Sequence, residues 1–62
     1  MSKFIILTAI NESNKQEFKL LVNVDNIVYS YEENNLTCIL FTNSNRKTVK
    51  ETIKEIQLLI EE

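Results

Sequence analysis

Apolar residues recur at every second position in four segments of the chain, and this alternation is the feature that most limits its fold. The segments are KFIILTAI at 3–10, EFKLLV at 17–22, NIVYSYE at 26–32 and LTCILFT at 36–42. A period of two is the period of a β-strand. Short polar turns separate the segments, and strands linked so closely pair antiparallel because parallel neighbours need long crossovers. The sequence therefore predicts an antiparallel β-meander of four strands.

The predicted strands differ in how many of their faces are apolar. The first strand is apolar on both, with Phe4, Ile6, Thr8 and Ile10 on one face and Ile5, Leu7 and Ala9 on the other. The fourth is similar, with Leu36, Cys38 and Leu40 opposite Thr37, Ile39 and Phe41. In the third, Ile27, Tyr29 and Tyr31 share a face. In the second, Phe18, Leu20 and Val22 lie opposite Glu17, Lys19 and Leu21, so one face is largely solvated, which is typical of an edge strand.

The spacing of apolar residues changes after the Asn43–Asn45 turn. The new spacings are i, i+4, i+7 and i+11, which predict an amphipathic C-terminal helix with one buried stripe, formed by Val49, Ile53, Ile56 and Ile60. Two threonines carry the signature of a helix cap, since Thr48 is followed three residues later by Glu51, and Thr52 by Glu55. If Thr48 caps the helix, Val49 belongs to its buried stripe. If Thr52 does, Val49 ends a short fifth strand.

Glycine and proline are both absent, although the chain must turn several times. Asparagine is the commonest other residue at positive φ, and it clusters where turns are expected. The clusters are Asn11 and Asn14, Asn34 and Asn35, and Asn43 and Asn45. We therefore expect asparagine to supply the left-handed conformations of the turns.

The small size of the chain favours self-association. A single domain of residues 1–62 buries a core that only marginally offsets the entropy of folding. One cysteine and no histidine exclude an internal disulfide and an ordinary zinc site. One helix covers one face of the sheet, and the other face then exposes a patch of the kind that marks an interaction site. We predict a homodimer or higher oligomer, with an interaction surface formed by Ile5, Leu7, Tyr29, Tyr31, Ile39 and Phe41.

The charged residues argue against nucleic acid as the main partner. The net charge is −2, and the only basic cluster consists of Arg46, Lys47, Lys50 and Lys54, the candidates for phosphate contact. Glu51 and Glu55 interrupt this cluster. On a helix that began at Thr48, Glu51 would lie within ion-pair distance of Lys47 and Lys54, as on a solvated face. A nucleic-acid-binding regulator that uses this cluster is the alternative function.

The sequence offers no catalytic constellation. Without histidine no Ser–His–Asp triad can form, and without glycine there is no phosphate-binding loop. Cys38 lies mid-strand between apolar residues, which favours a buried thiol. We predict no catalysis, no cofactor and no metal. The apolar run at the start of the sequence is too short for a signal peptide or a bilayer span, which predicts a cytoplasmic protein without membrane contact.

The carboxy-terminal half, TCILFTNSNRKTVKETIKEI, resembles the FlbD family of short bacterial flagellar-operon proteins. In that family a strand ends in a hairpin, a basic pair follows, and a valine–lysine–glutamate–serine run opens a helix. The similar residues here are Thr42 and Asn43, then Arg46 and Lys47, then Val49, Lys50, Glu51 and Thr52. Ser44 stands where the family has glycine. The resemblance implies a strand before Val49, a cap at Thr52 and no catalytic residue. A weaker similarity links the same region to the end of LytTR-type DNA-binding domains.

These observations predict an α+β fold, an antiparallel β-meander of four to five strands with one C-terminal amphipathic helix. The predicted function is that of a non-catalytic, self-associating, protein-binding module, an adaptor or regulator of bacterial or phage origin.

Overall fold

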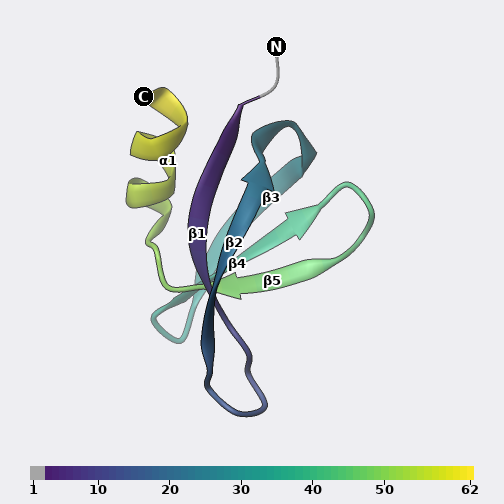
Figure 1. Cartoon of the computed structure of the whole chain (residues 1–62), viewed down its shortest axis with the longest axis vertical. Coiled ribbons are helices and arrows are strands. Elements are labelled where there is room, and N and C mark those ends of the chain that lie inside the picture. Colours follow the sequence, from purple (N-terminus) through teal and green to yellow (C-terminus); the bar gives the residue numbers. More distant parts are fainter. Residues whose placement is uncertain (1–2) are drawn as a thin grey trace.

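Five β-strands and one α-helix form the protein, whose computed structural model describes residues 3–62 (Figure 1). The elements are β1 (Phe4–Ile10), β2 (Glu17–Asn23), the 3₁₀ turn η1 (Val24–Asn26), β3 (Ile27–Glu33), β4 (Leu36–Phe41), β5 (Arg46–Val49) and α1 (Ile53–Glu61). All strand pairs are antiparallel. The predicted α+β class, with a β-meander and one C-terminal helix, is confirmed.

The strands lie in the order β2-β1-β5-β4-β3. Strands β3, β4 and β5 form the meander, and the β1–β2 hairpin joins it because β1 pairs with β5 where Ala9 lies opposite Val49. Strand β2 is an edge strand, as its alternating pattern predicted. The pairing of β1 with β5 was not predicted, since these strands are far apart in the sequence.

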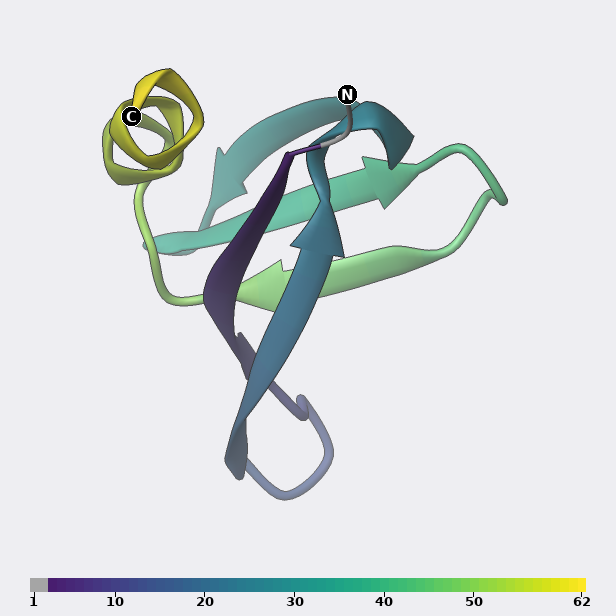
Figure 2. The same ribbon diagram turned by 45° about the horizontal axis from the view of Figure 1, so that its top comes forward.

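The link between β2 and β3 forces the sheet to curl. These strands are the two edges of the sheet, which would lie about 19 Å apart in a flat sheet with strands spaced about 4.8 Å. The η1 turn between them has three residues, so the end of β2 and the start of β3 can lie about 14 Å apart at most. The two edges are therefore drawn together, and Figure 2 shows the β1–β2 hairpin crossing in front of β4 and β5.

Hydrogen bonds hold η1 to both halves of the curled sheet. The N–H of Val24 donates to the carbonyl of Lys3 over 2.9 Å, and the N–H of Thr42 donates to the carbonyl of Asn26 over 2.8 Å. One end of η1 is thus tied to the start of β1, and the other to the residue after β4.

The core lies on the concave side of the curled sheet, which we call the inner face. Its buried apolar residues are Ile5, Leu7, Ala9, Val22, Ile39, Val49 and Ile56. Cross-strand register explains this selection in the hairpin, where Ile5 lies opposite Val22 and Leu7 opposite Leu20. The convex outer face carries the alternate residues of each strand.

A β-bulge in β3 changes which residues share a face. Ile27 lies opposite Phe41, but Tyr29 lies opposite Leu40, so one residue of β3 is left without a partner. Ile27 therefore packs against the core while Tyr29 is exposed. The prediction that Ile27 shares a face with the two tyrosines is wrong for this reason.

Helix α1 begins after Thr52, as the resemblance implied. The N–H of Glu55 donates to the Thr52 hydroxyl over 3.1 Å, and the N–H of Thr52 donates to the Glu55 carboxylate over 2.9 Å, a complete capping box. Val49 ends β5 and is buried there. Lys47 and Glu51 precede the helix, so Glu51 does not form the helical ion pairs with Lys47 and Lys54 that a start at Thr48 would allow.

Asparagine is not the only residue type that adopts a left-handed conformation in the turns. Positive φ angles occur at Asn34 and Asn35, as predicted, but also at Lys15 and Ser44. In the other two turns asparagine acts through its side chain. The carbonyl oxygens of Asn11, Asn14 and Asn43 each accept a hydrogen bond from the N–H two residues ahead.

We predict that Thr52→Ala lowers the free energy of unfolding by about 1 kcal/mol, because it removes the hydroxyl that accepts the Glu55 N–H. Urea denaturation followed by circular dichroism measures the change. Thr52→Ser retains the acceptor and is the matched control. Equal stability of the alanine and serine variants would contradict a contribution from the cap.

We predict that Ser44→Gly raises the free energy of unfolding by about 0.5–1 kcal/mol. Ser44 has φ of 70°, where a side chain is strained and glycine is not. Asn43→Gly is the control, since it removes the side-chain acceptor of the Asn45 N–H without relieving a positive φ, and it should destabilise the protein. The prediction fails if Ser44→Gly unfolds at a lower urea concentration than the parent.

Candidate interaction surface

The predicted interaction residues divide between the core and the surface. Ile5, Leu7 and Ile39 expose 5%, 0% and 0% of their area, and Phe41 is half-buried against the same core. The assignment of Ile5, Leu7 and Ile39 to an interaction surface is wrong, because they are buried in the core, while that of Phe41 stays a prediction. Helix α1 covers the inner face, where Ile56 packs into the cluster that holds these residues.

The two predicted tyrosines do lie at the surface. Tyr29 is exposed and Tyr31 half-buried, and their ring centroids are 6.2 Å apart on the outer face of β3. The neighbouring Val28 is also exposed. We call Val28, Tyr29 and Tyr31 the β3 surface, and its role in binding stays a prediction.

A larger exposed apolar surface lies on the β1–β2 hairpin. Phe4, Ile6 and Leu21 expose 55%, 60% and 66% of their area, and Ile6 lies directly opposite Leu21 across the two strands. We call these three residues the β1–β2 patch. Leu58 of α1, also exposed, lines a hollow together with Ile6. The alternation in β1 identified Phe4 and Ile6 as one of its two apolar faces, but Leu21 was assigned to the solvated side of β2.

The four residues of the basic cluster do not form one surface. Arg46 and Lys47 are successive residues of β5, so their side chains leave the strand in opposite directions. Lys50 follows β5 and forms an ion pair with Glu17 at 3.1 Å, while Lys54 lies in the first turn of α1. A phosphate backbone therefore meets no continuous row of cations here.

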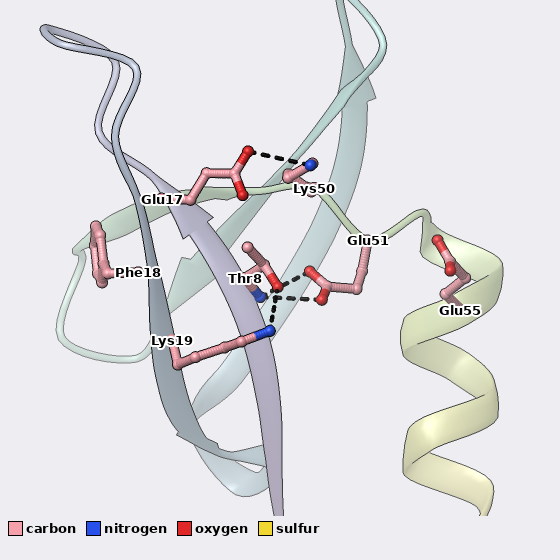
Figure 3. A pocket seen from close by; sticks show the side chains of 7 residues that line it. All are labelled: Thr8, Glu17, Phe18, Lys19, Lys50, Glu51 and Glu55. Atoms are coloured by element: carbon pink, nitrogen blue, oxygen red, sulfur yellow. Dashed lines mark hydrogen bonds and ion pairs between the residues drawn. The ribbon is translucent and has the colours of Figure 1, made fainter.

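A polar hollow beside β1 holds several charged side chains that neutralise or bond one another (Figure 3). It is lined by Thr8, Glu17, Phe18, Lys19, Lys50, Glu51 and Glu55. The N–H of Thr8 donates to both carboxylate oxygens of Glu51, at 2.9 and 3.0 Å. The Lys19 ammonium donates to the Thr8 hydroxyl over 3.1 Å, and Lys50 pairs with Glu17.

These contacts make the hollow a structural joint. Glu51 belongs to the connection between β5 and α1, so its two hydrogen bonds fix the start of the helix to the middle of β1. The Glu55 carboxylate is likewise used in the helix cap. Both carboxylates therefore accept backbone hydrogen bonds that position the helix.

Among residues 3–62, no group of three or more histidine, cysteine, aspartate or glutamate side chains is arranged to hold a metal ion. No helix in this part of the chain is long and apolar enough to cross a membrane.

Cys38 is half-buried on the outer face, not fully buried as predicted. Its sulfur lies 3.9 Å from the Thr48 hydroxyl, which donates to Glu12 over 2.7 Å. Tyr31 is its cross-strand neighbour. The charge of the ionised Cys38 thiol raises the pKa of Tyr31 above its ordinary value of 10.0.

No family model, no curated protein and no solved structure matches the chain. The resemblance to the FlbD family therefore stays a prediction.

We predict that Tyr31 ionises at a higher pH than an ordinary tyrosine. The negative charge of Cys38 disfavours a second negative charge on the neighbouring phenol. Ultraviolet absorbance in a Tyr29→Phe background reports Tyr31 alone. Adding Cys38→Ser, which removes the ionisable group, should move the transition to lower pH. An unchanged transition would show that the thiol is not the cause.

Proposed function

We propose that the protein is a non-catalytic, self-associating, protein-binding module, and that copies associate through the β1–β2 patch. The observation that supports this most is the exposure of Phe4, Ile6 and Leu21 on adjacent strands of so small a chain. Burying a large apolar side chain contributes about 1.5–3 kcal/mol, and native stability is a small difference between large terms. Covering the patch would therefore add substantially to a core of seven fully buried apolar residues.

The β3 surface supports the second part of this proposal, the binding of another protein. Strand β3 pairs with neither β1 nor β2, so the β3 surface and the β1–β2 patch lie on different strands of the sheet. Aromatic side chains are enriched at protein interfaces. A module with two separate apolar surfaces can associate with itself through one and bind a partner through the other. We propose a role as an adaptor or regulator in the cytoplasm of a bacterium or of a phage-infected cell, which agrees with the FlbD resemblance.

We predict that the purified protein sediments as a dimer or higher oligomer at tens of micromolar. Ile6→Lys combined with Leu21→Lys places two charges on the patch without altering the core, and should give a monomer. Tyr29→Lys is the matched control on the β3 surface and should leave association intact. Analytical ultracentrifugation of the three proteins measures this.

The outcomes distinguish the two surfaces. A monomeric parent protein would overturn the proposal. An oligomer that dissociates with Tyr29→Lys but not with the double variant would move self-association to the β3 surface.

A further inference from the structure

Strand β1 has one fully paired edge and one edge that is open along half its length. Backbone groups of successive residues in a strand point to opposite sides. The carbonyl of Lys3 accepts from Val24, and the N–H of Asn11 donates to Gln16, so the odd-numbered residues bond toward β2. The N–H and C=O groups of Phe4, Ile6 and Thr8 therefore point away from β2.

Only Thr8 of these three residues has its outward groups satisfied. Its carbonyl accepts from the N–H of Lys50 over 2.9 Å, and its N–H donates to Glu51. Strand β5 ends at Val49 and reaches no further along β1. Within residues 3–62, no hydrogen bond uses the outward N–H or C=O of Phe4 or Ile6.

The open edge also lacks the charged side chains found on the other edges of the sheet. Exposed edges are commonly protected by charged side chains, because unpaired backbone groups recruit another strand. The edge strand β2 carries Glu17 and Lys19, and the edge strand β3 carries Glu32 and Glu33. The open stretch from Phe4 to Leu7 carries no charge at all.

Helix α1 flanks this edge and runs antiparallel to β1 (Figure 1). The Lys3 ammonium donates to the carbonyl of Ile60 over 2.6 Å at one end, and Glu51 bonds Thr8 at the other. Two hollows lie along the edge between these ties. Their lining is apolar and mainly acidic, and consists of Lys3, Phe4, Ile5, Ile6, Glu51, Glu55, Leu58, Leu59 and Glu62.

We propose that the open edge of β1 pairs antiparallel with the same edge of a second copy, about a two-fold axis at Ile5. This inference rests on the proposed self-association and names its geometry. Phe4 then lies opposite Ile6 of the second copy, and the reverse pair follows by symmetry. Each pair exchanges two backbone hydrogen bonds, so four bonds satisfy the groups that one copy leaves open.

The side chains of β1 suit this pairing. Phe4 of one copy meets Ile6 of the other on the outer face, so the two β1–β2 patches become continuous across the axis. The antiparallel arrangement also brings Lys3 of one copy opposite Leu7 of the other, toward the end of the edge where Glu51 and Glu55 lie. The Lys3 ammonium of each copy therefore approaches the acidic side chains of the other copy. Apolar continuity and charge complementarity both favour a second copy as the occupant.

Cysteine cross-linking tests the register. In a Cys38→Ser background, a mixture of Phe4→Cys and Ile6→Cys proteins should form a disulfide-linked dimer under mild oxidation. Opposed residues of a hydrogen-bonded antiparallel pair have Cα atoms about 5.5 Å apart, within reach of a disulfide. Either variant alone should remain uncross-linked, since its own copies are diagonal neighbours about 7–8 Å apart. Both positions are exposed, so the fold should tolerate the substitutions.

The outcomes separate this inference from the proposed function. Cross-linking in the mixture alone establishes the pairing. Equal cross-linking in the single variants would overturn this register, as would an oligomeric parent protein whose mixture gives no covalent dimer. In that last case self-association stands and only its geometry is wrong. A parent protein that sediments as a monomer would overturn both.

Discussion

The three-residue link between β2 and β3 is the constraint on which the rest of the structure depends. These strands are the two edges of a five-stranded sheet, and Val24–Asn26 is too short to connect them across a flat one. The curled sheet has a concave face that one short helix can fill, with Ile56 packed among residues of β1, β4 and β5. The convex face is left without any covering element, and its apolar residues stay exposed.

The contact between Glu51 and Thr8 marks the point where pairing along the edge of β1 stops. Strand β5 has four residues and pairs with β1 at a single position, after which the chain must leave the sheet to begin α1. The Glu51 carboxylate takes the next free N–H of β1 with two hydrogen bonds, so a side chain replaces the missing strand. Beyond Thr8 nothing in the described chain replaces it.

Local patterns in the sequence predicted β1 to β4 and the helix, while β5 depended on the choice between the two caps, for which the family resemblance implied Thr52. No local pattern indicated which face of β1 is buried. Both faces are apolar, and a six-residue turn leaves the register of the β1–β2 hairpin undetermined. The prediction took the wrong face of β1 as the exposed one. It therefore placed Ile5, Leu7 and Ile39 on the interaction surface and left Leu21 out of it. The bulge beside Tyr29 and the pairing of β1 with β5 depend on the curled sheet, so no local pattern could indicate them.

The position of the helix cap decides how much of β1 remains open. With the cap at Thr52, Val49 stays in β5 and reaches Ala9, and Lys50 and Glu51 then saturate Thr8. Had the helix begun at Thr48, β5 would lose Val49, its one point of pairing with β1. The observed cap instead leaves two residues, Phe4 and Ile6, with outward backbone groups and exposed side chains together. This stretch has unpaired backbone groups and exposed apolar side chains together. It can therefore offer a second strand both hydrogen bonds and apolar contact, which is the combination that edge-to-edge association requires.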